Sequence, residues 1–114
     1  MSECLFCGIA NGTVPAERVA EGDGWVAVRD IHPQAPVHLL ILSTEHIENL
    51  NGLESGSVEL AGRLLLAARE VARRQGLAES GYRVVTNVNR DGGQTVPHLH
   101  LHVLGGRPMG WPPG

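Results

Sequence analysis

Hydrophobic and polar residues alternate strictly near the C-terminal end of the chain, in the segment His98-Leu99-His100-Leu101-His102-Val103-Leu104. Alternation with a period of two predicts a β-strand, in which residues two apart point to the same face about 6.6 Å from each other. Three imidazole rings would then line one face of the strand, while the apolar residues between them pack on the other. Because a solvated strand face usually carries threonine, lysine or glutamate, the pattern favours a chemical role for the histidines over a tolerant polar face.

The rest of the pattern predicts short strands and one long helix. An apolar stripe with helical spacing runs from Ser55 to Gln75 and ends at Gly76, a natural helix stop. Short strands in succession with one long helix indicate an α+β fold, an antiparallel sheet with the helix on one face, in a single domain of residues 1–114. The other expected elements are a short helical turn over 4–10 and strands over 18–21, 25–29, 38–43 and 82–88.

Composition and charge exclude several classes of function. The 114-residue chain has a net charge of −3, so it lacks the strongly basic surface of a nucleic-acid-binding protein. No apolar run approaches the length of a membrane span. Residues 1–4 contain neither the basic nor the long hydrophobic segment of a signal peptide. We therefore expect a cytoplasmic protein with no nucleic-acid or membrane partner.

A glycine-rich loop, Asp91-Gly92-Gly93-Gln94-Thr95-Val96-Pro97, immediately precedes the three histidines. Paired glycines let backbone N–H groups approach an anion closely, and Thr95 adds a hydroxyl. Glycine-rich turns are common, so the loop taken alone could be a plain tight turn. Beside three histidines, we interpret it as a phosphate cradle.

The histidines are the best nucleophile candidates, because the chain contains neither a serine nucleophile elbow nor a Walker loop. A neutral imidazole can attack phosphorus and form a phospho-histidine type of intermediate. The usual histidine pKa of about 6.5 keeps a useful neutral fraction at pH 7, and a protonated neighbour can stabilise phosphoryl oxygens. His38 begins a buried strand, where it either caps the strand or orients the other histidines; we favour the second role.

Cys4 and Cys7 have the Cys-x-x-Cys spacing, which places two thiolates on one tight turn. A tetrahedral zinc ion would need two more ligands, which His46 and one of the three C-terminal histidines could supply. From the residues alone, buried thiols, a local disulfide and a redox pair stay open, and His46 could be an ordinary surface histidine.

Together these motifs resemble the signature of the histidine-triad (HIT) family. The Gly-Gly-Gln loop and the C-terminal tail look like the Hint branch, the purine nucleoside phosphoramidases. The resemblance covers nearly the whole chain. Besides the three histidines, it includes Asp30-Ile31-His32-Pro33-Gln34-Ala35-Pro36-Val37-His38, Asp91-Gly92-Gly93-Gln94-Thr95, Leu104-Gly105-Gly106-Arg107 and Trp111-Pro112-Pro113-Gly114.

This resemblance implies a homodimer with one active site per subunit and a five-stranded antiparallel sheet, with helix 55–75 contributing to the dimer interface. It implies hydrolysis of the P–N bond of purine nucleoside phosphoramidates, through a nucleotidyl-histidine intermediate, with release of AMP. His100 would be the nucleophile, His102 would contact the phosphate and assist the leaving group, and His38 would support the nucleophile.

The resemblance also implies a set of substrate-binding residues. These are Asn87 at the phosphate or the leaving-group side, Gly93 and Thr95 at the phosphate, Asp30 at the ribose hydroxyls, Phe6, Val28 and Ile31 around the purine, and Trp111, which would reach toward the partner's site.

A structural zinc ion is a further implication. Many bacterial HIT proteins carry a cysteine pair and bind such an ion, although the best-known animal Hint proteins lack the pair. The corresponding ligands in this chain are Cys4, Cys7, His46 and His98.

Three positions depart from the familiar pattern. Thr95 stands where the Hint branch often has serine, and its hydroxyl can serve in the same way. Pro97 stands where an aromatic residue is familiar. Val28 is smaller than the usual aromatic residue, so we expect a looser base pocket.

Several alternatives share the same residues. Dinucleoside polyphosphate hydrolases also form a nucleotidyl-histidine, but they typically have glutamine where this chain has His102. The nucleotidyl transferase branch differs in its pattern around the triad. A non-catalytic nucleotide-binding or scaffold protein could keep all three histidines. A catalytic zinc ion held by three histidines is disfavoured, because residues i, i+2 and i+4 of one strand lie too far apart to meet one ion.

Overall fold

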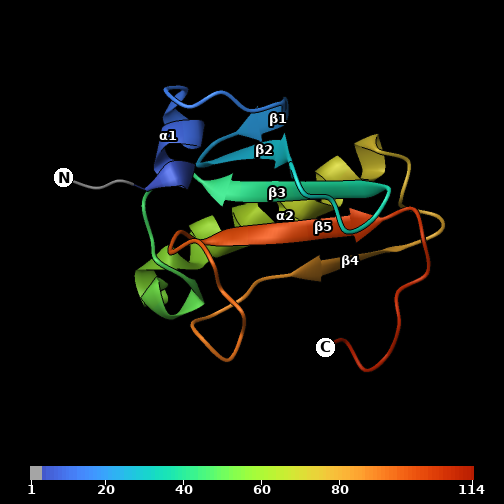
Figure 1. The fold of residues 1–114 in the computed structure, drawn as a ribbon. Coiled ribbons are helices and arrows are strands. Elements are labelled where there is room, and N and C mark those ends of the chain that lie inside the picture. Colours follow the sequence, from blue (N-terminus) through green and yellow to red (C-terminus); the bar gives the residue numbers. More distant parts are fainter. Residues whose placement is uncertain (1–3) are drawn as a thin grey trace.

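The computed structural model describes residues 4–114, which form a five-stranded antiparallel sheet with a helix on each face (Figure 1). Residues 1–3, on which the expected lack of a signal peptide partly rests, lie outside the described residues. Within residues 4–114, no helix is long and apolar enough to cross a membrane. In chain order the elements are α1 (Leu5–Asn11), β1 (Arg18–Gly22), β2 (Trp25–Arg29), β3 (Val37–Ser43), the 3-10 turns η1 (Leu50–Gly52) and η2 (Ser55–Ser57), α2 (Val58–Arg74), β4 (Tyr82–Val85) and β5 (His100–Gly105).

The strands lie in the order β1-β2-β3-β5-β4, and each neighbouring pair is antiparallel. β5 is therefore paired on both sides, by β3 and by β4, and its side chains sit on a rigid base. The predicted α+β fold, with an antiparallel sheet and one long helix, is confirmed.

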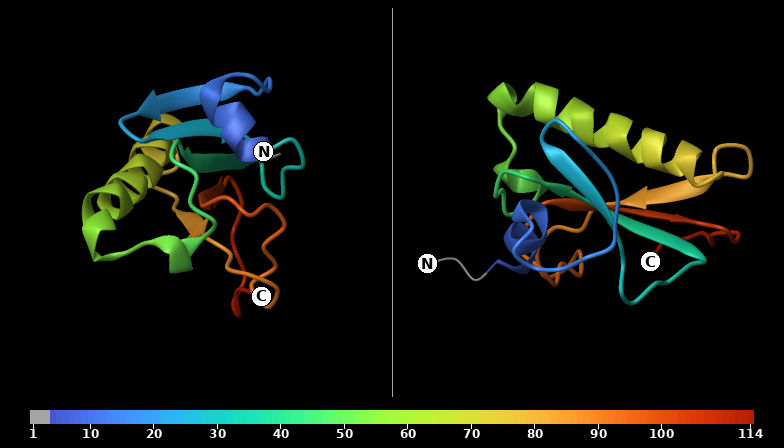
Figure 2. Two further views of the ribbon diagram at one scale, coloured as in Figure 1. Left: turned by 90° about the vertical axis from the view of Figure 1, so that its left-hand side faces the viewer. Right: turned by 90° about the horizontal axis from the view of Figure 1, so that it is seen from above.

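Alternation along the central strands creates two apolar cores, one on each face of the sheet. Figure 2 (right) shows α2 above the sheet and α1 below it. Leu99, Leu101 and Val103 belong to the core under α2, as the alternating pattern predicts, so His100 and His102 face the α1 side. The α2 core also includes Ala27, Leu39, Ile41, Leu64, Ala67, Ala68, Val71, Ala72 and Leu77. The α1 core consists of Phe6, Ile9, Val26, Val28, Leu40 and Leu42.

Two strand predictions are wrong by two residues or more at one end. The strand expected over 82–88 ends at Val85, because the Thr86 hydroxyl donates a hydrogen bond to the carbonyl of His100 (2.8 Å) and so occupies an acceptor that further strand pairing would need. The strand expected to begin at His98 begins at His100. The N–H of Leu99 donates instead to the carbonyl of Ile47 (2.6 Å), which pulls the preceding segment out of the sheet. The three histidines therefore do not share one strand.

The long helix matches its prediction except in its first turn, where residues 55–57 are a 3-10 turn and the α-helix begins at Val58. The short N-terminal helix is also confirmed. It ends at Gly12, whose φ of 88° is the left-handed conformation that glycine adopts without strain. The Arg18 guanidinium donates to the carbonyls of Ile9 (2.9 Å) and Ala10 (3.0 Å) at the end of this helix, where Ile9 also accepts from the N–H of Gly12 (3.2 Å). These bonds fasten α1 to β1 and fix the position of the cysteine pair at its start.

Candidate functional site

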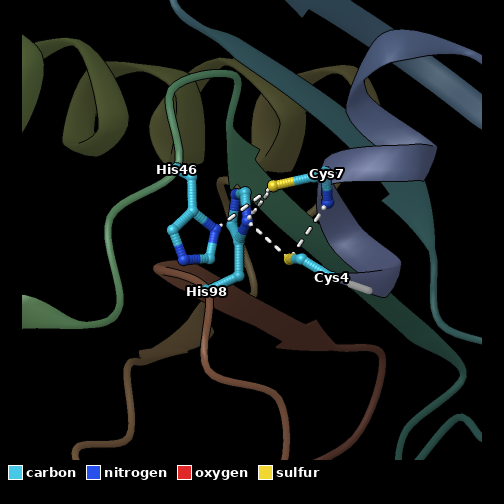
Figure 3. Close-up of side chains that lie close together, drawn as sticks. All are labelled: Cys4, Cys7, His46 and His98. Atoms are coloured by element: carbon cyan, nitrogen blue, oxygen red, sulfur yellow. Dashed lines mark hydrogen bonds between the residues drawn. The ribbon is translucent and has the colours of Figure 1, made fainter. Parts of the chain in front are cut away.

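Four potential metal ligands meet where the start of α1 approaches the segment before β5 (Figure 3). The ligand atoms of Cys4, Cys7, His46 and His98 all lie within 4.8 Å of one another. His98 Nδ1 is 3.2 Å from Cys4 Sγ and 3.5 Å from Cys7 Sγ, and His46 Nδ1 is 3.2 Å from Cys7 Sγ. A tetrahedral zinc ion would hold such atoms about 3.4–3.8 Å apart. The cluster therefore fits a metal ion such as zinc after only small adjustments.

A hydrogen bond holds His98 in the tautomer that can bind a metal ion. Its ring is fully buried, and its Nε2 lies 2.7 Å from the backbone carbonyl of Ser43. A carbonyl can only accept, so Nε2 carries the hydrogen and Nδ1 keeps the lone pair that faces the sulfurs. Burial lowers the pKa of His98 and favours the neutral ring. Both cysteines are thiols in the structure, not a disulfide, and His46, although exposed, points at the cluster.

In His100 the hydrogen and the lone pair occupy the opposite ring nitrogens from those in His98. Its Nδ1 lies 2.6 Å from the carbonyl of His98, so Nδ1–H donates and Nε2 keeps the lone pair. Phe6 packs edge-on against the ring at a centroid distance of 4.9 Å, which fixes its orientation. Burial lowers the pKa of His100, so the ring is held neutral. A neutral imidazole with a free Nε2 lone pair is the chemical form of a nucleophile.

His38 and His102 form a directed hydrogen-bond relay. The N–H of Gln34 donates to Nδ1 of His38 (3.0 Å), so in the neutral ring Nε2 carries the hydrogen. Nε2–H of His38 then donates to Nδ1 of His102 (2.8 Å), which leaves the hydrogen of His102 on its own Nε2. Asp30 Oδ2 lies 3.3 Å from His38 Nε2 and places a carboxylate beside the relay. The relay makes His102 a hydrogen-bond donor beside the His100 lone pair; their ring centroids are 5.1 Å apart.

A cluster of Asp30, His38 and His102 has the residue types of a second metal site. The donation from Gln34 N–H to His38 Nδ1 argues against it, because a metal at Nε2 would require the hydrogen on Nδ1, facing another donor. We therefore interpret these three residues as a proton-ordering relay.

A cavity of about 340 Å³ opens beside His100 and His102. It is lined by five of the predicted substrate-binding residues: Phe6, Val28, Asp30, Ile31 and Thr95. Asn87, Gly93 and Trp111 are not among its lining residues, and Trp111 is 84% exposed. The sequence analysis did not identify the lining residues Leu5, Ile9, Val14, Pro15, Ala16, Arg29, His32, Leu40 and Val96. The spacing of apolar residues within 5–16 is a sequence signal that could have identified several of these lining residues.

The buried histidines make the fold sensitive to acid. Burial, together with the nearby rings of His100 and His38, lowers the pKa of His102 from 6.5 to about 4. The unfolded chain therefore takes up the proton first, and the free energy of unfolding should fall as the pH drops from about 6.5 toward 4, by up to about 1.4 kcal/mol per pH unit for this group. Denaturant titrations at several pH values would measure the slope. His102→Gln should reduce it, and an unchanged slope would contradict the prediction.

The fold and its histidines are those of a HIT domain, and comparison with known proteins agrees. Residues 11–109 match the HIT domain family. A purine nucleoside phosphoramidase of Escherichia coli is 42% identical over 108 residues, which are 95% of this chain and 91% of that protein. An uncharacterized HIT-like protein of Synechococcus elongatus is 47% identical over 115 residues and matches along 100% of both chains. The crystal structure of a HIT family hydrolase from Legionella pneumophila superposes with a TM-score of 0.96, at 52% identity, over 98% of this chain and 100% of that one. This chain belongs to the histidine-triad family.

Proposed function

We propose that this protein is a nucleotide-binding hydrolase of purine nucleoside phosphoramidates, which cleaves the P–N bond of adenosine phosphoramidates and releases AMP. The observation that carries the proposal is the tautomer of His100: its Nδ1–H donates to the His98 carbonyl, so a lone pair on Nε2 is available at the cavity. The E. coli relative, whose name states this activity, supports the same substrate class.

The proposed reaction has two steps. Nε2 of His100 attacks the α-phosphorus, the P–N bond breaks, and the amine leaves with a proton taken up from solvent, while Nε2–H of His102 assists its departure by donating a hydrogen bond to the phosphoryl oxygens. Water then attacks the nucleotidyl-histidine, the bond from phosphorus to Nε2 breaks, and the proton from water returns to solvent. His38 takes no part in bond breaking; its donation to His102 keeps the second ring in the donor form. Net, one water adds across the P–N bond.

The cavity accommodates the nucleotide in a defined direction. The purine would lie among Phe6, Val28 and Ile31, and the ribose hydroxyls would bind Asp30. The phosphate would bind between His100, His102 and Thr95, with Gly93 and Asn87 contributing from the neighbouring loop. Figure 1 places this loop, residues 86–99, beside the amino end of β5.

A direct assay separates this function from its alternatives. Adenosine 5′-phosphoramidate is incubated with the protein, AMP release is followed by chromatography, and the protein is analysed by mass spectrometry for an adenylylated histidine. Release of AMP with a transient adduct supports the proposal. Faster cleavage of diadenosine polyphosphate would identify a polyphosphate hydrolase, and AMP binding without turnover of either substrate would identify a non-catalytic nucleotide-binding protein.

Asp30→Ala should raise KM for the phosphoramidate about 10- to 100-fold, because each hydrogen bond to a charged group contributes about 1.5–3 kcal/mol. Steady-state kinetics would measure the change. Asp30 also contacts His38, so a 2′,3′-dideoxy substrate is needed to isolate ribose recognition: parent and variant should then have similar KM values. Asp23→Ala, at an exposed carboxylate in the β1–β2 turn, is the matched control. An unchanged KM for the ribose substrate would remove Asp30 from the ribose site.

We also propose that the protein is a homodimer. β4 is an edge strand with exposed Tyr82 and Val84, and α2 exposes Leu65 and Leu66. Edge strands and contiguous apolar surface are usually covered in stable proteins. In the dimer, α2 would contribute to the interface and Trp111 would reach the partner's cavity. Sedimentation equilibrium would measure the mass, and Leu65→Glu/Leu66→Glu should shift it toward the monomer.

The Cys4, Cys7, His46 and His98 cluster is proposed to bind one structural zinc ion. Four protein ligands leave no position for water, which is characteristic of structural zinc sites. When bound, zinc would fasten the start of α1 to the segments that follow β3 and precede β5.

A further inference from the structure

The loop over residues 88–96, which carries Gly93 and Thr95, is not held by regular secondary structure. Two of its residues have left-handed backbone, Asn89 with φ of 57° and Gly93 with φ of 75°. For a residue other than glycine this conformation is uncommon and persists only where the surroundings fix it. The loop therefore requires specific partners to keep a single conformation.

The side chain of Gln94 closes the loop on itself. Its Oε1 accepts a hydrogen bond from the N–H of Asn89 (2.9 Å), and its Nε2 donates to the carbonyl of Val96 (3.0 Å). Nε2 also donates to the carbonyl of Glu48 (2.8 Å), which belongs to the segment after β3. One amide thus joins both sides of the loop to a second segment of the chain.

Asn49 adds further hydrogen bonds to Gln94 and to Asn89 from the segment after β3. Its side chain is buried, and its Nδ2 donates both to Gln94 Oε1 (3.1 Å) and to Asn89 Oδ1 (3.0 Å). Its Oδ1 accepts from the N–H of Asn51 (2.9 Å). The Gln94 amide then uses two donors and two acceptor positions, and Asn49 uses both donors. Only Asn49 is buried, whereas Gln94 is half-buried and Asn89 is exposed, so replacing Asn49 removes the two donors that fix these side chains.

We propose that Asn49 and Gln94 are positioning residues that hold Gly93 and Thr95 in the conformation that binds the substrate phosphate. This inference rests on the proposed function of the cavity. Neither residue lines that cavity, so both act only through the loop. The backbone between His46 and Asn49 gives the network a second anchor, because His46 belongs to the metal-ligand cluster and Ile47 accepts from Leu99.

Asn49→Ala and the isosteric Asn49→Asp test the inference. The aspartate keeps the acceptor for Asn51 N–H but loses both donors, so it serves if the alanine variant folds poorly. Asn51→Ala is the matched control, because that side chain is exposed and the network uses only the backbone of Asn51. Three quantities are measured: hydrogen exchange of amides 92–96 without nucleotide, the Kd for AMP by calorimetry, and kcat and KM for adenosine 5′-phosphoramidate.

Both Asn49 variants lose the two donations to Gln94 and Asn89, so they should exchange the loop amides faster and weaken AMP binding about tenfold or more. KM should rise in parallel while kcat changes little, because His100 and His102 are fixed by other contacts. Asn51→Ala should match the parent. Unchanged exchange and Kd in both Asn49 variants would overturn the inference and leave the proposed function intact. A parent protein that neither binds AMP nor hydrolyses the phosphoramidate would overturn both.

Discussion

His100→Ala should abolish turnover of adenosine 5′-phosphoramidate, with a loss of at least about a thousandfold in kcat, while the fold and AMP binding are largely retained. The physical reason is the Nε2 lone pair that the donation from Nδ1 to the His98 carbonyl leaves available at the cavity. Without it the covalent step has no nucleophile. Single-turnover kinetics and calorimetry with AMP measure the two effects separately.

His100→Asn is a stricter variant. An asparagine amide can still donate to the carbonyl of His98, so the local backbone keeps a partner, but it offers no imidazole lone pair. Both variants should lack the adenylylated form in mass spectrometry. Activity close to that of the parent in a clean preparation of either variant would exclude the covalent mechanism, even if AMP binding persists.

The sequence predicted the overall fold well because its signals are local. Leu99, Leu101 and Val103 alternate with polar residues, and this alternation alone assigns them to one face of a strand. The long helix was predictable from its apolar stripe, since Leu64, Ala68 and Val71 follow helical spacing and are buried. These features require no knowledge of distant contacts.

The errors arose where distant segments compete for backbone groups. His98 and Leu99 belong to the alternating pattern, but Leu99 N–H bonds to Ile47, far away in the sequence, and the strand begins only at His100. No local pattern reports such a partner. The end of β4 at Val85 depends in the same way on the bond from Thr86 to His100.

The protonation of the histidines could not be predicted from the sequence. The sequence identified the three histidines, yet their tautomers depend on backbone groups that no pattern names: the Ser43 carbonyl for His98 and the His98 carbonyl for His100. Because of these partners, His98 keeps its lone pair on Nδ1, which faces the metal-ligand cluster, and His100 keeps its lone pair on Nε2, which is available at the cavity. The hydrogen-bond network of Asn49 could not be predicted for the same reason, since a single asparagine in a loop has no distinctive spacing.

We expect the parent protein to contain about one zinc ion per chain. Replacing the cysteine pair, as Cys4→Ser/Cys7→Ser, should remove this ion and should lower Tm by about 10 °C or more. The thiolates supply half of the proposed tetrahedral ligand set, and serine hydroxyls are poor zinc ligands. Elemental analysis of protein purified without added metal or chelator measures the zinc, and calorimetry measures Tm. His46→Asn should lose zinc as well, whereas His32→Asn, outside the cluster, should retain it.

Loss of zinc should act on stability before it acts on chemistry. The ligands come from three separate segments that the ion would fasten together, so their release costs folding free energy directly. His100 keeps its own bond to the His98 carbonyl, and activity should persist at temperatures below the new Tm. The connection between the two sites is this carbonyl, because a displaced His98 also displaces the acceptor that orients the nucleophile. Absence of zinc from the parent, or equal zinc in the parent and the double variant, would show that the cysteine pair is not a metal site.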